Sequence, residues 1–186
     1  MQVKWWMIAL ALLLAFLLYV GLSPIDIGGL ERARRTACLN NTFQIGRAMM
    51  YYAEEHKGQY PPSFGVLIKQ DCFTTWRVFV CPSSKDRIPD EFQDNGPYRI
   101  DRAKEVDLEV LNRVEVWGSY VMVKGLKHAN RPDVIVVYEK PGHHQGAGRN
   151  CFFDDGHCVW LSETEFQERI KAQESKLREM NAKEIK

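Results

Sequence analysis

Asn150–Trp160, with the sequence NCFFDDGHCVW, is the stretch that decides the fold class. Apolar residues lie on both sides of Asp155-Gly156, and an Asp-Gly pair between apolar runs is typical of a β-hairpin with a two-residue loop. A type I′ turn needs positive φ at both central residues, which Gly adopts freely and Asp tolerates. We therefore predict a hairpin in which Asp155-Gly156 is a structural turn and Asp154 pairs with His157.

Much of the chain before the hairpin is rich in β-branched and aromatic residues. This composition favours strands, so further strands of an antiparallel sheet are predicted at Thr74–Cys81, Glu115–Val123 and Asp133–Tyr138. Residues 82–114 are polar, contain many turn-forming residues and show little periodicity. They are predicted to form a long surface excursion.

Residues 30–57 carry apolar side chains at the spacing of an α-helix. Lys57-Gly58 is a suitable helix stop, and Ser23–Gly29 (SPIDIGG), with one proline and two glycines, predicts a kink before the helix. The first 57 residues are therefore expected to form one long, kinked helical spine. The predicted core-facing stripe consists of Leu39, Phe43, Gly46, Met50 and Ala53.

Another helix is predicted after the hairpin. Ser162 is a favourable N-cap, Glu165 completes a capping box, and Leu161 can pack against Phe166 as a hydrophobic staple. Large apolar residues are few beyond Ile170. A mostly solvated tail helix is expected, with a partner-binding helix as the alternative.

The N-terminal segment is the most apolar part of the chain. No charged residue lies between Lys4 and Asp26, and as a helix this segment reaches roughly 31 Å, close to the ~30 Å core of a bilayer. Trp5 and Tyr19 lie near its ends, where aromatic rings favour the headgroup layer. A retained transmembrane anchor is predicted. The alternative, a cleaved signal peptide, is disfavoured by the length of the run and by the lack of an A-x-A-like site.

Two signals disagree about the orientation of the predicted anchor. Arg32, Arg34 and Arg35 outnumber Lys4, and the positive-inside rule alone would place the C-terminal bulk in the cytoplasm. The five cysteines instead favour an oxidising compartment.

The charge balance argues against binding to nucleic acid. The 25 Lys and Arg residues nearly cancel the 24 Asp and Glu residues, and basic residues do not cluster into a stripe. No nucleophile motif or Gly-rich phosphate loop is present. We therefore assign no nucleic-acid partner, no cofactor and no catalytic residue.

Five side chains are the candidates for a metal site. Imidazole and carboxylate groups in this segment suit Zn²⁺ or a hydrolytic water, and the carboxylates alone suit Ca²⁺. However, no periodicity positions the two adjacent histidines, and the turn accounts for the Asp-Gly pair. No metal site is assigned. The candidates are His143, His144, Asp154, Asp155 and His157.

The cysteines contain no C-x₂-C pair, so a zinc ribbon is not predicted. Cys72 can close a short loop with Cys81, and Cys38 can reach Cys81 if the N-terminal helix packs on that segment. Both pairings remain open. Cys151 and Cys158 are only diagonal neighbours across the predicted hairpin, which is a poor disulfide geometry. The odd count leaves at least one cysteine unpaired or intermolecular.

Several short motifs occur in a fixed order along nearly the whole chain. They are Glu31-Arg-Ala-Arg-Arg-Thr-Ala-Cys38, Asn40-Asn41, Gln44-Ile-Gly46, Tyr51-Tyr52, Tyr60-Pro-Pro62, Val80-Cys81-Pro82-Ser83, Ser119-Tyr-Val121 and Phe153-Asp-Asp-Gly-His157. With them, the chain resembles the bacterial type II secretion prepilin-like (pseudopilin-like) proteins, whose C-terminal motif is a histidine, about nine residues and then Asp-Gly.

The resemblance implies a pilin-like α+β fold, in which a long N-terminal helix lies against a small antiparallel sheet outside the cytoplasmic membrane. Two departures from the family pattern are present. No Gly precedes the apolar run and no acid lies inside it, which puts processing and docking into a pseudopilus in doubt. Ten residues, not nine, separate His144 from Asp155. The structural motif positions are Asn40, Asn41, Cys81, Pro82, Asp155 and Gly156.

These features predict three parts: residues 1–28 as anchor and kink, 29–161 as a pilin-like extracytoplasmic domain, and 162–186 as a polar C-terminal helix. The predicted protein is a non-enzymatic, single-pass component of the bacterial inner membrane with its C-terminal domain in the periplasm. Its expected partners are inner-membrane lipid and other pilin-like or secretion-system proteins. The alternatives are a membrane-tethered periplasmic binding module and a metal-dependent enzyme.

Overall fold

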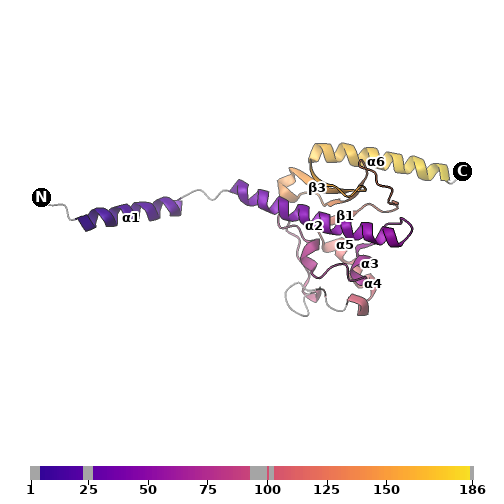
Figure 1. Ribbon diagram of the computed structural model, residues 1–186, viewed down its shortest axis with the longest axis horizontal. Coiled ribbons are helices and arrows are strands. Elements are labelled where there is room, and N and C mark those ends of the chain that lie inside the picture. The colour runs from indigo at the N-terminus through magenta and orange to yellow at the C-terminus, as the bar shows by residue number, and fades with distance from the viewer. Residues whose placement is uncertain (1–4, 23–26, 93–99, 101–102, 185–186) are drawn as a thin grey trace. The chain divides into compact units, whose positions relative to one another are not determined.

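The computed structural model describes residues 5–22, 27–92, 100 and 103–184. The chain divides into two compact units, Met1–Leu30 and Glu31–Lys186 (Figure 1). Each unit has its own architecture.

Helix α1, Trp5–Leu22, forms the first unit, and it carries no charged side chain. The predicted helix is therefore present, but no helix in the described part of the chain is long and apolar enough to cross a membrane. The 18 residues of α1 reach about 27 Å, less than the ~30 Å of a bilayer core. Residues 23–25 of the predicted span, and much of the predicted kink, lie outside the described residues.

A four-stranded antiparallel sheet with the order β1-β2-β3-β4 is the centre of the second unit. The prediction of an α+β fold with a small antiparallel sheet is confirmed. Its meander order means that each strand pairs with its neighbour in sequence. The strands are β1 (Tyr120–Met122), β2 (Ile135–Glu139), β3 (Gly148–Phe153) and β4 (Cys158–Ser162).

The hairpin joining β3 and β4 is present, but its turn differs from the prediction. The Gly156 N–H donates to the Phe153 carbonyl (2.9 Å), and the Phe153 N–H donates to the His157 carbonyl (2.9 Å). Gly156 has φ of 92°, whereas Asp155 has no positive φ. The type I′ turn and the Asp154–His157 pair are therefore wrong. The loop has three residues, and Gly156 occupies the left-handed bulge position.

Two of the predicted strands are partly helical. The segment predicted at Thr74–Cys81 forms the 3₁₀ helix η1, Trp76–Phe79, and only the end of the segment predicted at Glu115–Val123 enters the sheet, as β1. Trp76 packs edge-on against Phe92 and Trp117, with ring centroids 4.9 and 6.0 Å apart. The aromatic residues of this segment therefore pack into the core and do not pair as a β-strand. Residues with high β-propensity can do this because β-propensity depends on the packing context.

Helix α2, Ile27–Glu55, contains the predicted N-terminal helix of the second unit. Met50 and Ala53 of the predicted stripe lie on its buried face, but Phe43 is 43% exposed, and Ile45 and Met49, which the stripe did not include, are fully buried. Gly46 is correctly placed on that face. A Cβ at Gly46 would lie 2.2 Å from the Phe152 ring, so only glycine lets α2 approach β3 this closely.

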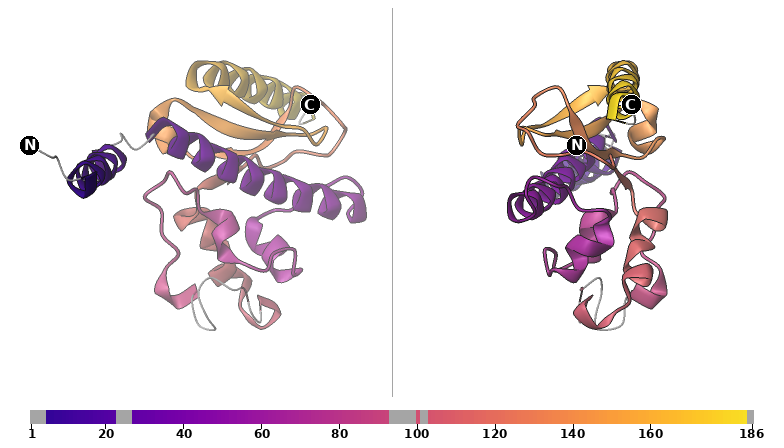
Figure 2. Two further views of the ribbon diagram at one scale, coloured as in Figure 1. Left: turned by 60° about the vertical axis from the view of Figure 1, so that its left-hand side comes forward. Right: turned by 90° about the vertical axis from the view of Figure 1, so that its right-hand side faces the viewer.

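Short helices form a second layer on the other side of α2 from the sheet (Figure 2). The predicted surface excursion 82–114 contributes buried side chains to this layer, among them Ile88, Phe92 and Leu111, so its description as a surface segment is wrong. The layer comprises α3 (Phe64–Lys69), η1, η2 (Asp90–Phe92), η3 (Ala103–Glu105), α4 (Leu108–Asn112) and α5 (Val114–Trp117).

The C-terminal helix α6, Glu163–Glu184, begins as predicted. Ser162 Oγ accepts from the Glu165 N–H (3.3 Å), and a Glu165 carboxylate oxygen accepts from the Ser162 N–H (3.0 Å), which is a capping box. Phe166 and Ile170 are buried against the sheet. Gln173 is also buried and bonds both backbone groups of Ile135. These three side chains dock α6 onto the sheet, while most of its other described side chains are exposed, as predicted for a mostly solvated helix.

Candidate functional site

The predicted metal candidates do not form one site in the described structure. His144 lies against Glu31 and Glu139, whereas the neighbouring His143 ring pairs with Asp86 (3.1 Å). Asp154 bonds Tyr60, and Asp155 contacts His157. A single site built from all five predicted side chains is therefore excluded by their separate contacts.

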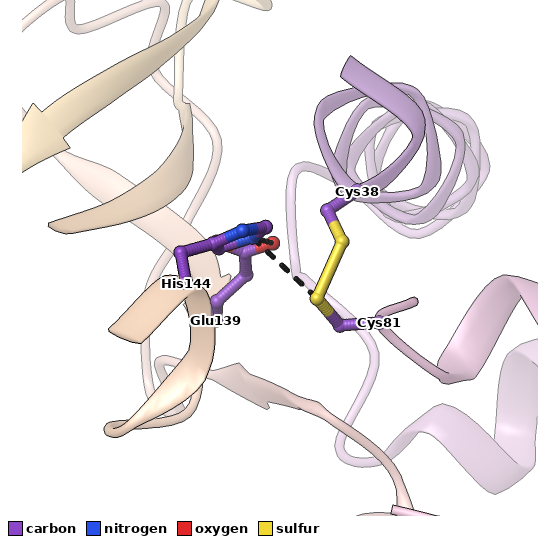
Figure 3. Close-up of side chains that lie close together, drawn as sticks. All are labelled: Cys38, Cys81, Glu139 and His144. Carbon is purple, nitrogen blue, oxygen red and sulfur yellow. Dashed lines mark hydrogen bonds and ion pairs between the residues drawn. A yellow bond between two sulfur atoms is a disulfide. The ribbon is translucent and has the colours of Figure 1, made fainter. Parts of the chain in front are cut away.

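A different cluster brings together four buried side chains that offer metal-ligand atoms: Cys38, Cys81, Glu139 and His144. The four ligand atoms all lie within 4.8 Å of one another. Figure 3 shows Cys38 pointing from α2 toward the other three side chains. We call these four residues the Cys–His–Glu cluster.

The two cysteines of the cluster form a disulfide, with their Cα atoms 5.3 Å apart. This resolves the open pairing in favour of Cys38–Cys81. The disulfide joins α2 to the segment that follows η1, and both side chains are at most 1% exposed. Among the described residues, Cys72, Cys151 and Cys158 are free thiols.

His144 is positioned by an unusual backbone turn. It has φ of 51° and the following Gln145 has φ of 59°, although both carry side chains that disfavour the left-handed region. Such conformations cost of order 1 kcal/mol each and persist where surrounding contacts over-determine them. At His144 those contacts are made by both ring nitrogens.

The two ring nitrogens of His144 face different carboxylates. Nδ1 lies 2.6 Å from Glu31, and Nε2 lies 3.2 Å from Glu139 and 3.5 Å from Cys81 Sγ. A ring that donates to two carboxylates is the imidazolium. Burial alone would lower the pKa of His144, but the hydrogen bonds to Glu139 and Glu31 outweigh burial and raise it.

Glu139, the last residue of β2, is fully buried. Its carboxylate accepts from the backbone N–H of Asn150 (2.7 Å) and from the Asn150 side-chain amide (3.1 Å). Asn150 also donates to the Arg35 carbonyl (3.2 Å), which connects this carboxylate to α2. Each oxygen of Glu139 is therefore held in place, as a buried carboxylate requires.

Glu31 lies beside the cluster, against the His144 ring, and its side chain is 15% exposed. Burial works to raise its pKa, but hydrogen bonds from His144 and Ser83 lower it overall. The Ser83 hydroxyl lies 2.9 and 3.0 Å from the two carboxylate oxygens. Glu31 thereby fixes the orientation of the His144 ring.

Asp154, one of the predicted candidates, is the centre of a separate network. It accepts from the Tyr60 hydroxyl (2.6 Å), from His128 Nδ1 (2.9 Å) and from Arg131 Nε (2.8 Å). Backbone N–H groups of Ala129 and Arg131 complete its partners. Burial opposes ionisation of Asp154, but these hydrogen bonds lower its pKa to about 2. We call this network the Asp154 knot.

Asp155 and His157 form a local pair at the tip of the hairpin. The Asp155 carboxylate accepts from the backbone N–H of His157 (3.2 Å) and contacts its ring. The His157 ring stacks on Phe153, with centroids 4.3 Å apart. This arrangement is a turn contact rather than a set of converging metal ligands.

Sequence reasoning found part of the Cys–His–Glu cluster and missed the rest. His144 and the Cys38–Cys81 option were identified, whereas Glu139 and the contact of Glu31 were not. Glu31 and His144 are 113 residues apart, so no local pattern links them. The available signal was an acid at the end of the apolar run DVIVVYE, a position where a buried charge needs a partner.

Two of the predicted motif residues, Asn41 on α2 and Pro82 after Cys81, border a groove of about 700 Å³. Asn41 reaches across its edge and donates to the Val80 carbonyl (3.3 Å). Asn40 and Pro82 are exposed. Other residues lining the groove include Ala37, Arg77, Asp86 and Arg87.

No known protein-family model, no curated protein and no solved structure matches the chain.

Proposed function

We propose that the chain is a non-enzymatic, pilin-like structural or assembly component attached to the bacterial inner membrane by its N-terminal apolar segment. The observation that carries this proposal is the Cys38–Cys81 disulfide. It ties α2, the helix that follows the apolar segment in the chain, covalently to the layer of short helices. A helix fixed in this way is suited to transmit load from a membrane attachment to the domain.

The chemistry of the buried polar groups supports a structural role. A general acid or base must come within hydrogen-bond reach of its substrate. Glu139 and Asp154 are fully buried and already bonded, and Cys38 and Cys81 are joined to each other. These groups stabilise the domain in its present arrangement.

The disulfide also supports a periplasmic location for the domain, because disulfides persist in oxidising compartments. Helix α1 supports attachment to lipid, since its described side chains from Trp5 to Leu18 are exposed and uncharged. Other pilin-like or secretion-system proteins are the partners that this proposal implies.

Fusion reporters and fractionation of the full chain in a Gram-negative host test the proposal. Alkaline phosphatase fused after Lys186 should be active, and the chain should stay in the membrane pellet after carbonate extraction with Met1 or Gln2 at its N-terminus. A variant that lacks residues 1–28 is the control and should be soluble. Activity from a cytoplasmic reporter alone, or a mature N-terminus at or beyond Gly21, would contradict the proposal.

A structural role is tested separately by recovery of partners. Chemical crosslinking of whole cells, followed by purification of the tagged full chain, should recover pilin-like or secretion-system proteins. Recovery should be lost when residues 1–28 are removed. A full chain that is recovered only as a monomer would contradict the assembly role.

The groove beside α2 supports a second candidate, a membrane-tethered binding module. Its volume of about 700 Å³ lies in the range of small-molecule sites, roughly 300–1,000 Å³. Asn41, Arg77 and Arg87 supply polar groups at its wall. Stabilisation of the full chain by an anionic or polar small molecule, lost in Arg87→Ala, would favour this candidate.

A further inference from the structure

We propose that the Cys38–Cys81 pair, when reduced, binds one Zn²⁺ together with His144 and Glu139. The same residues thus form a disulfide in one redox state and a closed metal site in the other. This inference concerns the Cys–His–Glu cluster and is independent of membrane attachment and of assembly.

The donor atoms of the cluster suit Zn²⁺. Two thiolates, one imidazole and one carboxylate form a four-ligand set of the types that Zn²⁺ binds in tetrahedral sites. Soft sulfur donors disfavour Ca²⁺ and Mg²⁺, which prefer oxygen ligands. All four side chains are buried, so the set has no open position for a substrate and would be structural.

The spacing of the donor atoms also fits a tetrahedral zinc site. Tetrahedral Zn²⁺ with ordinary bond lengths places sulfur and nitrogen ligands about 3.5 Å apart and nitrogen and oxygen ligands about 3.3 Å apart. The observed separations are 3.5 Å between Cys81 Sγ and His144 Nε2, and 3.2 Å between that nitrogen and Glu139. Two of the tetrahedral edges are therefore already present. The two sulfurs, which are bonded to each other in the disulfide, have to separate to about 3.8 Å, and rotation about their Cα–Cβ bonds can supply this movement.

Neighbouring groups hold the ligands in place. Metal-bound histidines usually donate their second ring N–H to a carboxylate, which fixes the ring orientation. Here His144 presents Nε2 to the cluster while Nδ1 bonds Glu31. Asn150 holds Glu139, and the Cys81 N–H donates to the Ser119 hydroxyl (2.9 Å). The strained backbone at His144 aims the ring at this point.

A dithiol can act as the reductant that converts the disulfide into the zinc-binding form. The dithiol transfers two electrons and two protons to the disulfide, which gives two cysteine thiols and the oxidised dithiol. Zn²⁺ then replaces both thiol protons and the Nε2 proton of the imidazolium, so three protons are released. Metal binding requires deprotonated ligands in this way.

The test uses the full chain in detergent, reduced with a phosphine under argon and freed of excess reductant. Titration with Zn²⁺ against a chromophoric chelator should give one ion bound per chain, and Co²⁺ should give the thiolate charge-transfer and d–d bands of a tetrahedral site. The oxidised chain, which has the same sequence, should bind neither ion. Circular dichroism of each sample reports whether the reduced chain stays folded.

Variants locate the site. His144→Ala and Cys38→Ser should lower the affinity at least 100-fold, and Glu31→Gln, which only orients His144, should lower it about 10–100-fold. The matched controls Cys72→Ser, Cys151→Ala and Cys158→Ala should retain full binding.

Three results would overturn the proposal. They are a reduced, folded wild-type chain that binds no Zn²⁺, equal binding by the oxidised chain, and binding that depends on a control cysteine but not on His144. The oxidised wild type keeps the test decisive even if a variant fails to fold.

Discussion

Glu139 and Asp154 are two fully buried carboxylates at opposite ends of the β2–β3 ladder, and their surroundings differ in kind. Asp154 faces hydrogen-bond donors from Tyr60, His128 and Arg131. Glu139 faces an amide and an imidazole ring that also lies against sulfur. One end of the ladder is thus closed by fixed hydrogen bonds, whereas the other contains bonds that a change of redox state can rearrange.

This difference indicates where the domain is rigid and where it can respond to its environment. A buried carboxylate with a guanidinium partner stays ionised and costs several kcal/mol to disturb. A cluster that contains a disulfide depends on the compartment in which the chain resides. The four predictions below test that contrast, from the largest expected effect to the smallest.

Removal of the disulfide should give the largest loss of stability. The cross-link closes a loop with a sequence separation of 43, and the chain-entropy model assigns such a loop about 4 kcal/mol. The double variant Cys38→Ala/Cys81→Ala should therefore lower the free energy of unfolding by about 4 kcal/mol. Urea denaturation of the full chain in detergent, without reductant, measures the loss. Cys72→Ala, at an exposed free thiol, is the control and should change little.

Asp154→Asn should give the second largest loss, because it leaves the Arg131 guanidinium without its carboxylate. Breaking a buried ion pair on one side costs about 3–5 kcal/mol, and the lower limit applies because Arg131 is 33% exposed. The neighbouring Asp155→Asn is the matched control. Equal losses in both variants would show that the Asp154 knot is no stronger than a turn contact.

The outcome for the fold shows which interactions a sequence can reveal. The capping box at Ser162 and Glu165 was predicted because both partners lie within one helical turn. The hairpin was located, but its turn type was not, because Asp154 is drawn toward Tyr60, His128 and Arg131, which are remote in sequence. Interactions between neighbouring residues could therefore be predicted from the sequence. The turn type could not, because contacts with residues distant in the chain determine it.

The candidate site was even harder to predict from the sequence, because its residues are remote from one another in the chain. His144 stood out because it lies in a Gly-rich loop beside another histidine, but nothing in that loop indicates Glu31 or Cys81. The cluster forms only when α2, the segment that follows η1, β2 and the loop before β3 come together. Strand prediction at 74–81 failed for a related reason, since Trp76 finds its partners in Phe92 and Trp117, outside any ladder.

Acid pH should separate the two ends of the ladder. Asp154 has a pKa of about 2 in the folded chain against an ordinary value of 3.8, so its contribution is fully present above pH 4 and is lost as the pH falls through 2. This lowering of the Asp154 pKa corresponds to about 2 kcal/mol of folding stability. Denaturation of wild type and Asp154→Asn at pH 5 and pH 2 should show the difference between them shrinking by about that amount. A difference that does not depend on pH would mean that Asp154 does not act through its charge.

The smallest predicted effects distinguish a structural turn from a metal site at the tip of the hairpin. Gly156 has φ of 92°, and a β-branched side chain there is strained, so Gly156→Val should cost about 1–3 kcal/mol. His157→Ala should cost less than about 0.5 kcal/mol, because its ring is 44% exposed and its contacts, with Asp155 and Phe153, are local to the hairpin tip.

Thermal unfolding of the full chain, with and without a chelator, measures both variants. If His157→Ala or the chelator lowers the melting temperature of the oxidised chain as much as Gly156→Val does, the hairpin tip binds a metal. The hairpin end of the ladder would then also respond to its environment. The contrast between a fixed Asp154 end and a responsive Glu139 end would have to be abandoned, because metal-dependent chemistry would operate at both.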